Sequence, residues 1–313
     1  MKKNRFGSRL FMALVGVFLY APIVVLIVFS FNASKSRSVW AGFTFDWYLQ
    51  LFQNERILSA ITTTFLVSIL SALIATVVGT AAAIGFSSMK KRPRGLLLSV
   101  NNIPLINADI ITGVSLMLLF VFLGGALYGL GEVVNSIFGT ALNLRFRLGF
   151  GTLLMAHVTF NVPYVILSVM PKLRQLDKNL LEAALDLGAT PWQGFWKVVL
   201  PQIWPGVLNG LLIAFTMSID DFVISYFTAG SGVSTLAMEI YAMTRKRISP
   251  EINAISTLLF LFVLILLVII NVRQIRQERQ DKKEHGQGEL GSADEIVSGE
   301  IMSLLGEREG ERE

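Results

Sequence analysis

Three aspartates lie in otherwise uncharged apolar stretches of this sequence. Asp109 is the charged residue of the stretch 95–131, and Asp220 and Asp221 are the charged residues of 202–238. A carboxylate at the centre of a bilayer costs roughly 2.5–3.5 kcal/mol, so it normally faces a cavity or a partner. If both stretches begin at the same membrane face, the acids lie at a similar depth, roughly 20 Å in. Neither stretch contains a lysine or arginine, so such acids would attract a polyammonium ion and repel anions.

Adjacent aspartates cannot both face one pathway, because neighbouring residues on a helix point about 100° apart. Small and polar residues recur at helical spacing on one side of a helix predicted over 205–228: Gly210, Ala214, Ser218, Asp221, Ser225 and Thr228. We therefore expect Asp221 on the pathway and Asp220 against a neighbouring helix. Tyr226 could offer its ring to a cation. The alternative is that all three acids are hydrogen-bonded packing residues, either neutral or capping helices near the outer surface.

The remaining reactive residue types are sparse. His157 lies alone in the uncharged stretch 148–171, where a hydrogen-bonded packing role is expected. The chain has no cysteine and no second histidine near the first, so the sequence predicts no metal site, no cofactor and no covalent catalysis. It also has no G-x4-G-K-[ST] motif, so a phosphate-cradling loop is not expected.

The composition indicates a membrane protein. Hydrophobic residues make up 53% of the 313 residues and charged residues 16%, whereas soluble domains carry about 25% charged residues. Six apolar stretches can each supply a helix of membrane-spanning length. We expect spans at 10–31, 61–87, 96–123, 148–171, 205–228 and 252–272. Within the second, Ala75, Gly79 and Ala83 follow the four-residue spacing that lets helices approach closely.

The distribution of lysine and arginine predicts the orientation. With the N-terminus inside and the spans alternating, 19 of these residues lie inside and 8 outside. The rule that cytoplasmic loops are enriched in basic residues then places both termini in the cytoplasm. We expect a membrane domain over 1–272, with its core at about 57–272, and a disordered polar tail over 273–313.

The loop 172–203, between the fourth and fifth spans, is unusually apolar for a cytoplasmic loop. It reads as two short helices, 179–187 and 191–200. Gly188 ends the first, Thr190 caps the second, and Pro191 occupies its first position. So much apolar surface outside the bilayer indicates a protein contact. The alternative is a hairpin on the lipid headgroups, anchored by Trp192 and Trp196.

The residues of this loop resemble the EAA loop of ABC-importer permeases, whose pattern is E-A-A-x3-G-x9-I-x-L-P. The matching positions are Glu182, Ala183, Ala184, Gly188, Leu200 and Pro201, with Val198 where isoleucine is usual. The resemblance implies a six-helix, all-α membrane protein in which this loop docks in a separate ATPase subunit. Glu182 would then make a polar contact, Ala183 and Ala184 a close apolar one, and Gly188 the turn.

Three further segments resemble the spermidine/putrescine permeases of this superfamily, namely 103–119, 151–164 and 218–259. The resemblance implies a polyamine importer of the bacterial inner membrane. The chain would pair with a homologous permease, two copies of an ATP-binding subunit and an extracytoplasmic substrate-binding protein, besides membrane lipid. The stretch 124–146 is longer than expected for that family, which puts docking of the binding protein there in doubt.

Several alternatives remain from the sequence. The same machinery could carry another solute, such as ferric ion or thiamine, whereas an oxyanion fits poorly with unpaired acids. A proton-coupled secondary transporter using Asp109, Asp221 and His157 would leave the apolar loop unexplained. An intramembrane hydrolase would need paired acids or a histidine cluster, and neither is evident. The basic residues follow the membrane spans, so nucleic acid is not an expected partner.

Overall fold

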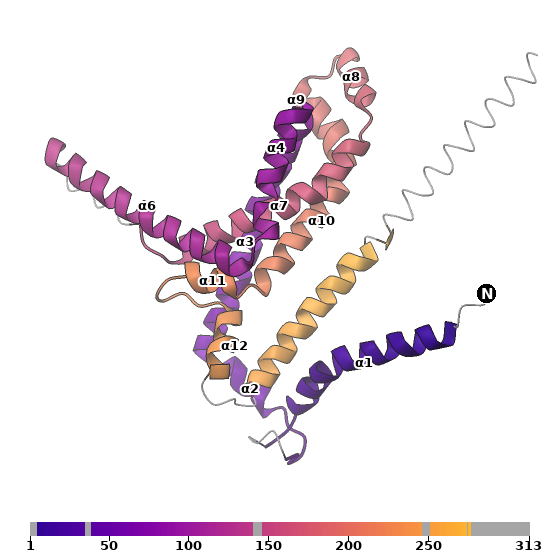
Figure 1. Ribbon diagram of the computed structural model, residues 1–313, viewed down its shortest axis with the longest axis vertical. Coiled ribbons are helices and arrows are strands. Elements are labelled where there is room, and N and C mark those ends of the chain that lie inside the picture. Colours follow the sequence, from indigo (N-terminus) through magenta and orange to yellow (C-terminus); the bar gives the residue numbers. More distant parts are fainter. Residues whose placement is uncertain (1–4, 35–38, 140–145, 246–250, 274, 277–313) are drawn as a thin grey trace, which may run out of the picture. The chain divides into compact units, whose positions relative to one another are not determined.

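The computed structural model describes residues 5–34, 39–139, 146–245, 251–273 and 275–276 (Figure 1). The chain divides into two compact units, Met1–Ile265 and Leu266–Glu313. In the second unit, the described residues are the last turns of the final helix and residues 275–276. Most of the predicted tail 273–313 therefore lies outside the described residues, as do Lys246, Arg247 and part of the stretch 124–146.

The described residues are almost entirely helical. The helices are α1 (Arg5–Phe29), α2 (Asp46–Gln53), α3 (Glu55–Ser88), α4 (Lys91–Asn101), α5 (Ile103–Ile106), α6 (Asp109–Phe138), α7 (Phe150–Gln175), α8 (Lys178–Asp186), α9 (Pro191–Gly194), a π-helix (Phe195–Val199), α10 (Leu200–Ile219), α11 (Val223–Thr228), α12 (Leu236–Arg245) and a final helix (Glu251–Arg273).

Six helical segments of the described chain are long and apolar enough to cross a membrane. They are Arg9–Phe29, Glu55–Ser88, Asp109–Phe138, Phe150–Gln175, Pro191–Ile219 and Glu251–Arg273. The predicted fold class, an all-α membrane protein with six spans, is confirmed.

Two predicted spans were wrong in their limits. The third does not run over 96–123, because the chain breaks after Asn101 and again at Asn107, whose ψ of 149° is extended. Asp109 is consequently the first residue of α6 rather than a mid-helix residue. The predicted helix 205–228 is also interrupted, since α10 ends at Ile219 and α11 begins at Val223.

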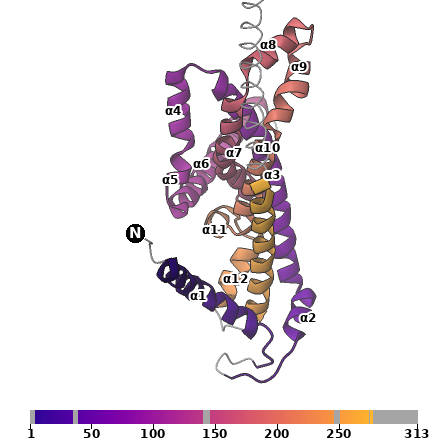
Figure 2. The same ribbon diagram turned by 90° about the vertical axis from the view of Figure 1, so that its right-hand side faces the viewer.

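A bundle of α3, α7 and α10 forms the centre of the first unit, and the three helices lie side by side in both views (Figures 1 and 2). Val165 of α7 is fully buried between its two neighbours. A Cβ at Gly79 of α3 would lie 2.8 Å from the Val165 side chain, and one at Gly210 of α10 would lie 3.2 Å from the Val165 Cα. The small residues predicted in the second span therefore serve close helix packing, as expected.

This packing predicts opposite effects for two glycines of α3. Gly79→Ala should destabilise the protein by about 1–3 kcal/mol, because the added methyl group overpacks the contact with Val165. Gly85→Ala meets nothing within 4 Å and should be neutral or stabilising by up to about 1 kcal/mol, since alanine favours the helix. Thermal unfolding of the purified variants in detergent measures both. Equal midpoints for the two variants would contradict the packing argument.

Candidate functional site

The loop after α7 begins and ends its first helix with standard capping contacts. The Asp177 carboxylate accepts a hydrogen bond of 2.9 Å from the Asn179 N–H at the start of α8. At the other end the Ala189 N–H donates to the Ala184 carbonyl at 3.0 Å, and the Gly188 N–H donates to the Leu185 carbonyl at 2.9 Å. Gly188 has a φ of +86°, which favours glycine. Together these contacts form a Schellman motif, so the predicted helix stop is confirmed.

The second helix of the loop starts as predicted but does not end at Leu200. The Thr190 hydroxyl accepts from the Gln193 N–H at 3.3 Å, and the Gln193 side chain accepts from the Thr190 N–H at 3.0 Å, which is a capping box with Pro191 at the first position. The helix then widens into the π-turn Phe195–Val199 and continues into α10. Pro201 is the second residue of α10 and has no N–H to donate to the Lys197 carbonyl, which favours the wider turn.

α9, the π-turn and α10 form one continuous helix, so the second half of the loop is an extension of a membrane-spanning helix. A contact also ties α8 to α9, because Gly194 is buried and a Cβ there would lie 2.8 Å from the Leu181 side chain. Leu181 and Phe195 in turn pack against the buried core of the bundle. α8 therefore packs on α9, and α9 is continuous with α10. The sequence did not reveal this junction.

The outer surface of the loop is apolar and exposed. Leu187 is 89% exposed and Trp192 69% exposed, and Trp192 packs edge-on against Trp196 with ring centroids 5.5 Å apart. α8 and α9 lie together at the end of α7 and α10 that is remote from α11 and α12 (Figure 1). Soluble surfaces seldom carry such a patch unless a partner or a membrane covers it.

The residues of the EAA-like pattern divide by exposure. Glu182, Ala183, Gly188 and Pro201 are exposed, whereas Ala184, Val198 and Leu200 are half-buried. Glu182, Ala183 and Gly188 are thus available to a partner, whereas Ala184, Val198 and Leu200 are partly covered. The exposure of Glu182 and Ala183 is compatible with the contact that the pattern implies, whereas Ala184 is less accessible, and the contact itself stays a prediction.

The acidic pair lies at the break between α10 and α11. The Asp221 carboxylate accepts hydrogen bonds from the Ile224 N–H at 3.3 Å, from the Ser225 N–H at 2.7 Å and from the Ser225 hydroxyl at 2.9 Å. Its side chain is only 8% exposed. Asp221 therefore satisfies free N–H groups in the first turn of α11, and a carboxylate there also suits the helix dipole.

His157 of α7 completes this arrangement. Its Nε2 lies 3.5 Å from an Asp221 carboxylate oxygen and 3.0 Å from the Ser225 hydroxyl. One turn further along α7, Asn161 donates to the Ser218 hydroxyl at 2.7 Å. The predicted hydrogen-bonded packing role for His157 is confirmed, and polar contacts on α7 hold both sides of the break. The sequence signal was present, because an aspartate followed by a serine four positions later suits a helix start.

The other predicted pathway residues are exposed. Asp220, Asp109 and Tyr226 all have accessible side chains. α6 and α11 touch at Gly113, where a Cβ would lie 3.0 Å from the Phe227 ring. Asp109 lies one turn before Gly113 on the same face of α6, the face that meets α11. Which aspartate contacts a solute stays a prediction.

The proteins that this chain resembles are membrane subunits of transport systems. The family model for the "binding-protein-dependent transport system inner membrane component" matches residues 75–283. The putrescine transport system permease protein PotI of Escherichia coli (strain K12) is 38% identical over 253 residues, which are 80% of this chain and 85% of PotI. The spermidine/putrescine transport system permease protein PotC of the same strain is 34% identical over 251 residues, covering 80% of this chain and 87% of PotC.

Solved structures agree on the fold. A chain from the crystal structure of a bacterial ABC transporter involved in import of the acidic polysaccharide alginate matches with a TM-score of 0.62 at 18% identity. The match covers 87% of this chain and 94% of that one. At this identity the likeness concerns the fold alone.

Proposed function

Since this chain belongs to the family of binding-protein-dependent transport system inner membrane components, we propose that it is the permease subunit of an ABC importer that carries polyamines. The relatives named for putrescine and spermidine transport cover four fifths of the chain, which supports this substrate class. The observation that carries the proposal is the exposed apolar loop that continues without a break into α10, a helix whose other end leads to the accessible Asp220 and the nearly buried Asp221.

The loop 172–203 is the proposed docking site for a separate ATP-binding subunit. Glu182 and Ala183 face outward for the contact, and the aromatic cluster around Trp192 would be covered by it. Closure of two ATPase subunits would move α8 and α9, and the continuous helix would carry that movement into α10. The break at 220–222 then permits α10 to move while α11 stays bound to α7. ATP hydrolysis takes place in the partner subunit, and this chain is not itself an enzyme.

The proposed substrate pathway uses Asp109, Asp220, Asp221 and Tyr226. Carboxylates in a low-dielectric region attract cations, and a tyrosine ring can face an ammonium group. Asp221 is nearly buried, so its negative charge would attract the cation from a distance and its hydrogen bonds would hold α11. Asp220 and Asp109 are exposed and could contact the cation directly. This modifies the expectation from the sequence, in which Asp221 itself faced the solute.

The proposed assembly has four kinds of component. This chain pairs with a homologous permease, two copies of an ATP-binding subunit bind on the cytoplasmic side, and a substrate-binding protein delivers the solute from outside. The excess of basic residues in alternate loops supports cytoplasmic termini in a bacterial inner membrane. The membrane domain would comprise residues 1–272, and 273–313 would form a cytoplasmic tail.

Reconstitution tests the proposed function. The complete complex in proteoliposomes should import labelled spermidine or putrescine only when ATP and the binding protein are both present. A proton gradient without ATP should drive no uptake. Import by the purified chain alone along an ion gradient would overturn the proposal, and so would ATP-driven import restricted to an unrelated solute such as ferric ion.

A further inference from the structure

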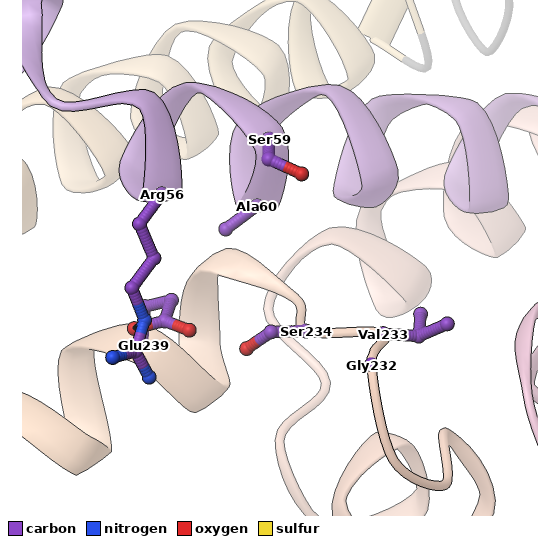
Figure 3. A pocket seen from close by; sticks show the side chains of 7 residues that line it. All are labelled: Arg56, Ser59, Ala60, Gly232, Val233, Ser234 and Glu239. Carbon is purple, nitrogen blue, oxygen red and sulfur yellow. Dashed lines mark ion pairs between the residues drawn. The ribbon is translucent and has the colours of Figure 1, made fainter.

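A pocket lies beside the first two turns of α3, between them and the segment 232–239 (Figure 3). Its volume is about 320 Å³, which falls in the lower part of the range for small-ligand sites. The lining comes from α3, from the loop before α12 and from α12 itself: Arg56, Ser59, Ala60, Gly232, Val233, Ser234 and Glu239.

The charges in this pocket are unequally buried. The Arg56 Nε lies 2.9 Å from a Glu239 carboxylate oxygen, yet the side chain of Glu239 is 4% exposed and that of Arg56 is 67% exposed. Figure 3 shows the arginine reaching from α3 across to the glutamate on α12. The buried Glu239 carboxylate needs a positive partner. Its partner Arg56 has a long side chain that is largely exposed to water. Another cation could therefore replace it.

Hydrogen bonds and buried packing hold the backbone around Glu239 in place. The Leu236 N–H donates to the Thr64 hydroxyl of α3 at 2.8 Å, and the Glu239 N–H donates to the Thr235 carbonyl at 3.0 Å. Beneath them, Leu236 packs in a buried cluster with Trp47 and Ile57. Opposite, Gly232 has a φ of +96° and no side chain to fill the space. Buried contacts thus fix the backbone that carries Glu239, whereas Arg56 is exposed and Gly232 leaves one side of the pocket open.

We infer that this pocket is an outer binding site for one ammonium end of the cargo, which displaces Arg56 as the partner of Glu239. The hydroxyls of Ser59 and Ser234 line the same pocket and can accept hydrogen bonds from an ammonium group. The inference rests on the proposed polyamine cargo. From this pocket α3 extends roughly 40 Å to its other end at Ser88. The site would therefore lie at the membrane face opposite the loop 172–203, where a binding protein would release its solute.

Displacement predicts opposite effects for the two charged residues. Arg56→Gln removes the competitor, so spermidine should bind more tightly, by about threefold, whereas Glu239→Gln removes the anion and should weaken binding about tenfold. An ion pair that only stabilises the fold would respond in the same direction to both changes.

The absence of cysteine from the chain allows a site-specific assay. In the full complex in nanodiscs, Val233→Cys, at a lining position without a proposed ligand role, places a single thiol in this chain, and the rate of its labelling by a maleimide is followed as spermidine is added. Protection should appear at about threefold lower spermidine with Arg56→Gln and at about tenfold higher spermidine with Glu239→Gln. Ser136→Cys on α6 and Glu55→Gln are the controls. Magnesium chloride at equal ionic strength should not protect.

The same preparation separates the two hypotheses. Import of spermidine by the complex decides the proposed function, and the protection pattern decides the pocket. Equal half-protecting concentrations in all backgrounds, or no protection in an importing complex, would overturn the ammonium site while leaving the importer intact. Lack of polyamine import would overturn the function.

Discussion

Gly188→Val abolishes solute uptake while the protein still inserts and folds: this is the expected result if the loop 172–203 couples the permease to an ATPase. Gly188 has a φ of +86° with nothing within 4 Å of an added Cβ, so the substitution acts through the backbone. A left-handed residue costs non-glycine side chains roughly 1–2 kcal/mol, and a β-branched one more. The turn between α8 and α9 would therefore change its shape.

The matched controls follow from the same geometry. Gly139 also has a positive φ, at the end of α6, and also has open space around it, so Gly139→Val applies the same strain away from the loop. It should leave uptake largely intact. Gly188→Asn should retain part of the activity, because asparagine tolerates this conformation. Uptake lost equally in Gly139→Val would show that strain alone, and not the loop, is responsible.

Glu182→Ala tests the contact surface of the same loop without altering its fold. Glu182 is exposed on α8, so we expect unchanged thermal stability, loss of co-purification with the ATP-binding subunit and loss of uptake. Asp186→Ala removes an equal charge from the same helix at a position outside the motif and should have little effect. Normal uptake in both Glu182→Ala and Gly188→Val would remove the coupling hypothesis.

The second large effect concerns the acidic break between α10 and α11. Asp221→Asn should reduce uptake at least about tenfold and also destabilise the protein by about 1–3 kcal/mol. One amide end cannot accept a hydrogen bond, so either the Ser225 N–H or the Ile224 N–H loses its acceptor, and His157 loses its charged neighbour. Uptake and thermal unfolding of the same variant measure the two effects.

Asp220→Asn is the comparison that separates loss of a negative charge from loss of the hydrogen bonds that start α11. Asp220 is exposed and its neighbour Asp221 makes the helix-starting contacts, so this variant should reduce uptake less and leave stability unchanged. A larger loss of uptake in Asp220→Asn than in Asp221→Asn would place the direct solute contact at Asp220 and refute the predicted order. Equal stability of the two variants would contradict the role of Asp221 in holding α11.

The local features of the loop could be predicted because they depend on short-range rules. A left-handed residue after α8, a capping threonine and a first-turn proline each act within a few residues of their own position, and Gly188, Thr190 and Pro191 behave as expected. The six spans were predictable for a similar reason, since bilayer thickness and the cost of unpaired backbone groups act on every apolar segment.

Features that depend on other helices were not predictable in this way. The acids Asp220 and Asp221 were placed on a continuous helix, because hydropathy does not register a break of three residues. His157 and Asn161 come from a helix more than 50 residues earlier, and their contacts hold the break. The third span began late because Asn107 is extended, which composition alone does not reveal.

Residue type and spacing by themselves determined that this is a six-span helical membrane protein with an exposed loop resembling the EAA loop, because burial in lipid and helix capping are local constraints. Tertiary structure decided which charges meet. Arg56 and Glu239 are 183 positions apart in the numbering, and Asp221 finds His157 and the start of α11 only once α7, α10 and α11 have packed. Electrostatic pairing depends on distance in space, which sequence spacing does not supply.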